Sequence, residues 1–196
     1  MIGVIAVKDR SPHLRECINN ARAAGCCQVI VVDTGAPDDS VEVATQLSCI
    51  VRKGPKHAWR GLDHNMDLAF EEAVTLAGGN EQCFALFLEP DEEVYTDMAL
   101  RDLLDDSELP ERPTGMSLRV VTGHGPCRQV RLLRVSEPWK HKGFWICREG
   151  VIEEVPNDLA FIVPIHQVPR RTVGTGPGLT RPGADGGHPI SINYLE

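Results

Sequence analysis

Carboxylates follow a strongly apolar stretch near the middle of the chain. Residues 83–88 read Cys-Phe-Ala-Leu-Phe-Leu, and four acids and a proline come directly after them in residues 89–93. On an extended backbone Glu89 and Asp91 point the same way, because residues two apart share a face. Two oxygen donors side by side suit Mg²⁺ or Mn²⁺, in particular a cation that also binds phosphate. An acidic loop that only caps a strand is the alternative at this point.

Acids also follow two other apolar stretches. Residues 2–7 lead into Lys8-Asp9, and residues 28–32 lead into Asp33. Carboxylates accept hydrogen bonds from nucleobase N–H groups and ribose hydroxyls. A nucleotide with its metal at one edge of a sheet explains this recurrence better than separate solvated loops do.

The elements that must position these acids alternate along the chain. Residues 2–7, 28–33, 48–52 and 83–88 have the continuous apolar character of buried parallel strands. Ser11-Pro12 and Gly25 mark the start and end of one helix, and helical spacing predicts others over 41–47 and 62–76. This alternation predicts βαβ units with right-handed crossovers and a mostly parallel sheet. Ligands of such open sheets bind beyond the carboxyl ends of the strands.

The second half of the chain has a different pattern. A short helix over 98–104 is expected, followed by partly polar strands near 116–121, 129–134, 143–147 and 159–165. These strands predict a small antiparallel sheet packed beside the parallel one. We expect one domain over 1–168, with a nucleotide-binding half (1–105) and an acceptor half (106–168). Residues 169–196 are rich in glycine and proline, which predicts a flexible tail or lid.

Composition narrows the class of protein. The 196 residues are 42% hydrophobic and 24% charged, with a net charge of −8, which is ordinary for a soluble domain. The negative charge argues against a nucleic-acid coat or an anionic membrane as general partner. No apolar run approaches the ~18 residues of a membrane span, and residues 1–7 are expected to form a strand and not a basic leader with a cleavage site. Seven cysteines without a metal-type pair are expected to be reduced thiols of a cytoplasmic protein.

Several segments, in this order, resemble a family-2 glycosyltransferase of the GT-A fold. The branch concerned has a small catalytic domain that is often fused to tetratricopeptide repeats, and the likeness covers roughly residues 2–170. The segments that carry it are Lys8-Asp9-Arg10, Val32-Asp33-Thr34-Gly35-Ala36-Pro37-Asp38, Trp59 with His64-Asn65, Leu88-Glu89-Pro90-Asp91-Glu92, Arg131-Leu132-Leu133-Arg134, Ile152-Glu153-Glu154 and Ile165-His166.

The resemblance implies a Rossmann-like α/β/α architecture and a set of ligand-binding residues. In this family Asp91 would bind Mn²⁺ or Mg²⁺, with support from Glu89 and with His166 completing the coordination. The residues implied for the nucleotide-sugar donor are Val7, Lys8, Asp9, Asp33, Asp38, His64, Asn65, Glu89, Pro90 and Arg131.

Three positions depart from the family pattern. Glu89 stands where the family has an aspartate, so the ligand carries one more methylene. His64 replaces an arginine that would meet phosphate, and Glu153 replaces a histidine. The donor and metal site is therefore better supported than the acceptor chemistry.

An inverting transfer needs a general base that deprotonates the acceptor hydroxyl. The family alignment favours Glu154, and its neighbour Glu153 is the next candidate, because only one of two adjacent strand residues can point inward. Glu92 and Glu93 are rival bases. An exposed acidic rim is the alternative for all four residues.

These features predict a metal-dependent, inverting glycosyltransferase that uses a nucleotide-diphosphate sugar, with a UDP-sugar favoured. The hydroxyl acceptor is open between a saccharide, a protein side chain and a hydroxymethylated DNA base; Lys140-His141-Lys142 and Arg170-Arg171 would form the groove for the last. A nucleotidyltransferase is the alternative enzyme, although Lys8 to Leu14 lacks the expected glycine-rich loop. A catalytically degenerate nucleotide-binding module is the non-enzymatic alternative. The oligomeric state stays open.

Overall fold

The computed structural model describes most of the first 165 residues. The described residues are 1–8, 11–54, 61–96, 100, 102, 113–122, 124–141, 145–146, 152–154 and 160–165, with the side chains of 61–64, 145–146, 152–154 and 161 left aside. The elements are β1 (Ile2–Val7), α1 (Leu14–Ala23), β2 (Gln28–Asp33), α2 (Ser40–Gln46), β3 (Ile50–Lys53), α3 (Gly61–Ala77), β4 (Phe84–Leu88), β5 (Glu92–Thr96), β6 (Gly115–Thr122), β7 (Gly125–Arg134), β8 (Lys140–His141), β9 (Trp145–Ile146), β10 (Ile152–Glu154) and β11 (Ala160–Pro164).

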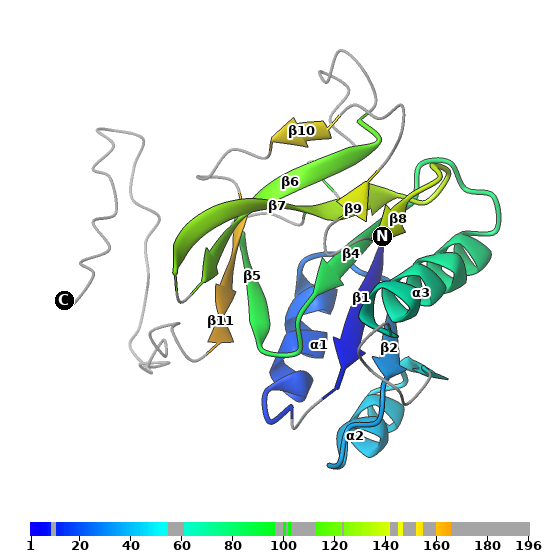
Figure 1. The fold of residues 1–196 in the computed structure, drawn as a ribbon, viewed down its shortest axis with the longest axis vertical. Helices are drawn as coiled ribbons and strands as arrows, with labels where there is room; N and C mark the ends of the chain where they lie inside the picture. Colours follow the sequence, from blue (N-terminus) through cyan, green and yellow to red (C-terminus); the bar gives the residue numbers. More distant parts are fainter. Residues whose placement is uncertain are drawn as a thin grey trace, which may run out of the picture.

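In the described part of the chain nine strands form one sheet (Figure 1). Its order is β3-β2-β1-β4-β7-β6-β11-β5, and β10 pairs with β6. The first four strands are parallel, with Val7 opposite Asp33, Asp33 opposite Lys53 and Ile5 opposite Leu88. Their carboxyl ends therefore meet at one edge. The predicted α/β fold with a mostly parallel sheet is confirmed.

Helices cover both faces of the parallel strands and make three layers. Alternate strand residues such as Ile5 and Val31 pack in one core cluster with Leu14 and Ile18 of α1. The intervening strand residues pack in a second cluster with Ala69, Phe70 and Ala73 of α3. Each buried side chain of valine or leucine size contributes roughly 1.5–3 kcal/mol. The continuous apolar runs of the sequence are thus explained by burial on both faces.

Helix α1 begins later than the Ser11-Pro12 motif predicts. Its first residue is Leu14, and His13 precedes it without a side-chain cap. The backbone N–H of Ser11 donates instead to Asp38 Oδ2 at 2.7 Å. The predicted end is confirmed, because Gly25 has φ of +105° and Cys26 N–H donates to the Ala21 carbonyl at 3.0 Å.

A side chain of α1 anchors β5, which the sequence did not predict as a strand. The Val94 N–H donates to Asn20 Oδ1 at 2.6 Å, and Asn20 Nδ2 donates to the Val94 carbonyl at 3.1 Å. Asn20 Nδ2 also donates to Glu93 Oε1 at 3.2 Å. One amide therefore fixes the chain that follows the acidic turn after β4.

The antiparallel strands of the second half extend the main sheet. Strand β7 pairs with β4 through Phe84–Arg134 and Leu86–Leu132, and β6 then pairs with β7. This arrangement satisfies the backbone groups on the open side of β4, which would otherwise be an exposed sheet edge. The separate antiparallel sheet is the two-stranded β8–β9, held to α3 where His141 N–H donates to Asp67 Oδ1 at 2.9 Å.

Several expected features lie outside the described residues. They include the tail or lid over 169–196 and all of the helix over 98–104 except Leu100 and Asp102. Leu100 is fully buried and its N–H donates to the Ala24 carbonyl at 3.0 Å. Six cysteines fall in the described ranges, and each is a free thiol. Within those ranges no helix is long and apolar enough to cross a membrane.

Candidate nucleotide and metal site

The carboxyl ends of β1, β2 and β3 are tied together by backbone hydrogen bonds. Thr34 donates to the Val7 carbonyl through its N–H at 2.8 Å and through its hydroxyl at 2.9 Å. The Gly54 N–H donates to the Asp33 carbonyl at 2.7 Å. These bonds fix the positions of the three strand ends relative to one another, at the sheet edge that is expected to bind the nucleotide. Val7 contributes only backbone to it, because its side chain is fully buried in the core, whereas Lys8 is exposed.

Asp33 caps the turn that follows β2. Its Oδ1 accepts hydrogen bonds from the Gly35 N–H at 2.8 Å and the Ala36 N–H at 2.9 Å. This is the Asx-turn arrangement of a short acidic side chain. Its Oδ2 has no hydrogen-bond partner among the described residues, so one carboxylate oxygen can accept a bond from a ribose hydroxyl or a base N–H.

Asp38 uses both carboxylate oxygens within the protein. Oδ2 accepts from the Ser11 N–H, and Oδ1 accepts from the hydroxyl and the N–H of Ser40, the latter at 3.1 Å. The Ser40 hydroxyl is the main cause of the lowered pKa of Asp38. Asp38 therefore joins the start of α1 to the start of α2, and its geometry fits a structural role next to the site.

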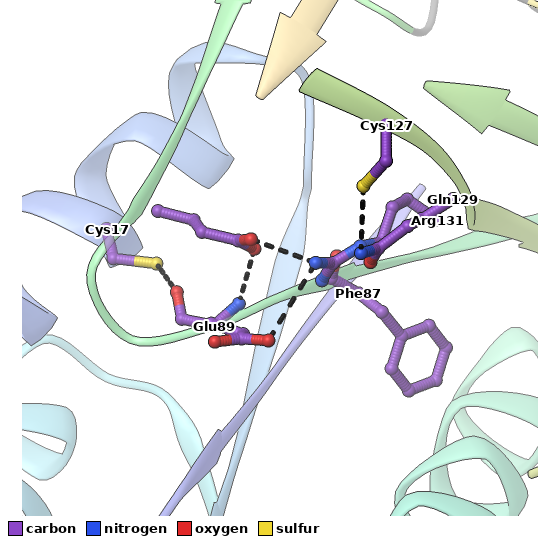
Figure 2. A network of polar contacts seen from close by, with 7 residues as sticks. Cys17, Phe87, Glu89, Cys127, Gln129 and Arg131 are labelled. Atoms are coloured by element: carbon purple, nitrogen blue, oxygen red, sulfur yellow. Dashed lines mark hydrogen bonds and ion pairs between the residues drawn. The ribbon is translucent and has the colours of Figure 1, made fainter. Parts of the chain in front are cut away.

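The acidic segment after β4 is a tight four-residue turn with Pro90 at its second position. The Glu92 N–H donates to the Glu89 carbonyl at 3.0 Å, and the Glu89 N–H donates to Glu92 Oε2 at 2.8 Å. The Cys17 thiol of α1 also donates to the Glu89 carbonyl, at 3.2 Å (Figure 2). The side chain of Glu89 is 68% exposed and that of Glu92 8%, so the two ends of the turn face opposite environments.

Arg131 of β7 lies buried beside this turn. Its Nη2 is 2.9 Å from Glu92 Oε1 and 3.9 Å from Glu89 Oε1. Nη1 donates to the Phe87 carbonyl at 3.3 Å, and Nε donates to Gln129 Oε1 at 3.0 Å (Figure 2). Burial raises the pKa of the Glu92 carboxyl, and Arg131 opposes that shift. The guanidinium is turned toward protein groups and not toward the open edge of the sheet.

Asp91 connects the turn to the last described strand. Its carbonyl accepts a hydrogen bond from the Ile165 N–H at 2.7 Å. The residue after Ile165 is the predicted metal ligand His166, which lies outside the described residues, as does Asp9. The described backbone thus ends directly beside the Glu89–Glu92 turn.

The other predicted residues are spread over the sheet. Glu153 and Glu154 lie on β10, opposite Met116 and Ser117 of β6. Strand β7 separates β6 from β4, so three strand spacings, ~14 Å along the sheet, lie between β10 and β4. The side chains of Glu153 and Glu154 are not described, and neither is that of His64.

Asn65 is on α3 and is only 2% exposed. Its Oδ1 has no hydrogen-bond partner among the described atoms. The carboxamide covers Gly54 so closely that a Cβ at this glycine would lie 2.5 Å from Oδ1. Asn65 therefore packs on the end of β3, one residue beyond Lys53.

The described carboxylates fit a divalent cation only in part. No group of three His, Cys, Asp or Glu side chains in the described ranges could hold a metal ion. The turn supplies two carboxylates, Glu89 and Asp91, and Mg²⁺ in phosphate-transfer sites is often held by one or two carboxylates plus substrate phosphates. Two protein ligands with a diphosphate are thus an adequate donor set.

Sequence reasoning missed the pairing of Glu92 with Arg131. It named Glu92 as a rival base, with an exposed acidic rim as the alternative, and Arg131 as a donor-binding residue, whereas the structure buries both side chains. The sequence held a local signal for the burial of Arg131, because it directly precedes the apolar pair Leu132 and Leu133, which the structure buries fully. The role of Cys17 had no local signal in the sequence, because its partner is 72 residues away.

Comparisons with known proteins found structural similarity without a sequence relative. No protein-family model and no curated protein matches this chain. HddC from Yersinia pseudotuberculosis is 11% identical, with a TM-score of 0.48, over 84% of this chain and 93% of that chain. S. aureus TarS 1–349 in complex with UDP is 15% identical, with a TM-score of 0.42, over 62% of this chain and 37% of that chain.

A further structure of S. aureus TarS is 16% identical with a TM-score of 0.41, again over 62% of this chain. The chain spans 21% of that TarS chain, so both TarS structures are much longer than the part that is matched. With TM-scores below 0.5, these similarities do not decide the activity.

Proposed function

We propose that this chain is a metal-dependent, inverting glycosyltransferase that transfers a sugar from a nucleotide diphosphate, with UDP favoured, to a hydroxyl acceptor. The observation that carries the proposal is the Glu89–Glu92 turn at the carboxyl-end edge of the parallel strands. It presents an exposed Glu89 and a half-buried Asp91, while the edge beside it is fixed by backbone hydrogen bonds of Asp33 and Thr34.

The residues of the edge would divide the donor between them. Asp33, through the Oδ2 that has no partner among the described residues, and Asp9 would bind the nucleoside. Asp91 with Glu89 would hold Mn²⁺ or Mg²⁺ against the diphosphate. The resemblance adds His166 as a third ligand, and the Ile165–Asp91 hydrogen bond supports this by bringing the preceding residue to the turn. When bound, the cation would stabilise negative charge on the departing diphosphate.

The general base is assigned to Glu154, with Glu153 as the alternative. Glu92 is unsuited to the task, because it is buried and bound to Arg131 and to the Glu89 N–H. Glu93 accepts a hydrogen bond from Asn20. A base must lie within reach of the acceptor hydroxyl, so this assignment requires the acceptor to bind between β10 and the turn after β4.

The acceptor is proposed to be a hydroxyl of a saccharide or a protein side chain. The alternative of modified DNA depends on free cations around Lys140. Lys140 Nζ lies 3.8 Å from Asp67 Oδ2 and 3.9 Å from Glu71 Oε1, so its charge is partly neutralised by α3. This weakens the argument for a basic groove at this place.

Asp91→Asn tests the metal assignment. We expect Mn²⁺-dependent stabilisation by UDP, and slow hydrolysis of one UDP-sugar, in the wild-type chain, and loss of both in Asp91→Asn. Glu81→Gln is the matched control, because Glu81 is an exposed acid at the opposite end of β4. Thermal shifts with UDP, CDP, ADP and GDP, with and without Mn²⁺, measure the first effect, and release of free sugar measures the second.

Two outcomes would reject the proposal. If no nucleoside diphosphate stabilised the wild type, the chain would have no donor site of the proposed kind. Formation of a nucleotide sugar and pyrophosphate from a nucleoside triphosphate and a sugar phosphate, without sugar transfer, would establish a nucleotidyltransferase instead.

A further inference from the structure

Arg131 occupies an irregular position in the sheet. Met116 of β6 pairs with Leu132, whereas the next residue, Ser117, pairs with Val130, so Arg131 is the extra residue of a β-bulge. Pairing between β7 and β4 also stops at Leu132. Bulges re-aim side chains and are frequent next to active sites. Here the bulge directs the guanidinium at the Glu89–Glu92 turn.

The guanidinium contacts three different parts of that region. It bonds the Phe87 carbonyl near the end of β4, pairs with Glu92 at the end of the turn, and approaches Glu89 at its start. Gln129, the next-but-one residue on β7, accepts from Nε and itself donates to the Cys127 thiol at 3.5 Å. The guanidinium is therefore bonded to β4 and its turn on one side and to Gln129 of its own strand on the other (Figure 2).

We propose that Arg131 is a positioning residue of the proposed donor site, which holds the Glu89–Glu92 turn so that Glu89 and Asp91 face the edge of the sheet. The contacts above support the position of the turn, and the expected effect on donor binding rests on the proposed function. Through Glu92, Arg131 fixes the carboxylate that accepts the Glu89 N–H. Its charge also offsets the mutual repulsion of the three acids of the turn.

A direct contact between Arg131 and the diphosphate is the competing role. The side chain of Arg131 is 9% exposed, and its hydrogen bonds go to Phe87, Gln129 and Glu92. A phosphate would have to displace Glu92, which would leave a buried carboxylate without its cationic partner. The geometry therefore favours action through the turn.

Hydrogen exchange tests the positioning role without any ligand. In Arg131→Met we expect the amides of Glu89, Glu92 and Ile165 to lose protection, because each N–H closes or flanks the turn. The Thr34 amide, bonded to Val7 at the same edge, should keep its protection. Arg131→Lys keeps the positive charge but lacks the planar guanidinium group, so its turn amides should lose less protection than those of Arg131→Met. Arg128→Met is the control, since it removes an exposed arginine from the same strand, whose guanidinium donates to the Ser117 carbonyl of β6 at 3.2 Å.

Nucleotide binding then tests the consequence. Loss of a residue that orients a metal ligand typically weakens metal affinity on the order of 10–100-fold, and we expect this for Mn²⁺-dependent UDP binding in Arg131→Met, with partial rescue in Arg131→Lys. Arg128→Met should bind as the wild type does. If Arg131→Met does not fold, Arg131→Lys and Glu92→Gln replace it in both measurements.

The outcomes separate the two proposals. Unchanged exchange of the turn amides in these variants would overturn the positioning role, and so would weaker UDP binding with a fully protected turn, which would indicate direct phosphate contact. Faster exchange in a chain whose wild type binds no nucleotide would support the structural role of Arg131 and reject the proposed function alone.

Discussion

Asp38 shows how one carboxylate next to the candidate site can serve the fold. Its bonds to Ser11 and Ser40 connect two loops that begin helices on the same face of the sheet. The lowered pKa of Asp38 means that folding favours its ionised form. Its contribution to stability is therefore present above its ordinary value of 3.8 and is lost as the pH falls through the lower pKa of the folded state.

Asp38→Ala is expected to destabilise the chain by about 1 kcal/mol at pH 7, the usual net value of such hydrogen bonds. The difference from the wild type should shrink below pH 4, since the unfolded carboxyl then takes up a proton. Urea unfolding at pH 7 and at pH 3 measures both quantities. Asp39→Ala is the control, because the exposed Asp39 makes no side-chain cap bond. An equal loss at both pH values would contradict the assignment.

At the scale of elements, the parallel strands were predictable and the pairing of the second half was not. The strands β1, β2 and β4 are apolar because both faces are buried, and that cause is visible in the local sequence. The pairing of β7 with β4 depends on residues about 50 positions apart, such as Phe84 and Arg134. Strand β5 begins with Glu92, whose burial depends on a cation 39 residues away. No local pattern contains that information.

The contact between β3 and α3 provides a test at the same scale. Gly54→Ala would place a methyl group 2.5 Å from Asn65 Oδ1, and overpacking of this kind costs roughly 1–3 kcal/mol. In Asn65→Ala the obstacle is gone, so the double variant should be more stable than the sum of the single effects predicts. A double-mutant cycle by urea unfolding measures the coupling. Strict additivity would show that the two elements do not meet at this point.

At the scale of the whole molecule, one sheet joins the two parts of the chain that the sequence patterns divide at residue 105. The boundary expected near residue 105 falls between β5 and β6, yet β7 pairs with β4 across it. The candidate site is likewise composite, because its turn is flanked by Arg131 and Ile165 of the second half. The sequence predicted one domain with two halves and a separate antiparallel sheet beside the parallel one. That strands of both halves share one sheet could not be predicted, because it depends on long-range pairing.

This union predicts that ligand binding stabilises the chain as a single unit. At a free UDP concentration 100 times its dissociation constant, with Mn²⁺, the added stability is about 2.7 kcal/mol. For a chain of this size that corresponds to an increase in Tm of roughly 5–10 °C. Trp139 is a suitable probe of the second half, because it is 2% exposed and packs in the same core cluster as Phe87 and Phe70.

In a Trp59→Phe/Trp145→Phe variant Trp139 is the one remaining tryptophan of the three in the sequence. Its fluorescence and the far-UV circular dichroism should report the same unfolding midpoint, and UDP with Mn²⁺ should move both by the same amount. A shared midpoint is the mark of two-state unfolding. If the ligand moved the dichroism midpoint and left the Trp139 midpoint in place, the two halves would unfold independently. The donor site would then belong to the first half alone, which is incompatible with a turn held by Arg131.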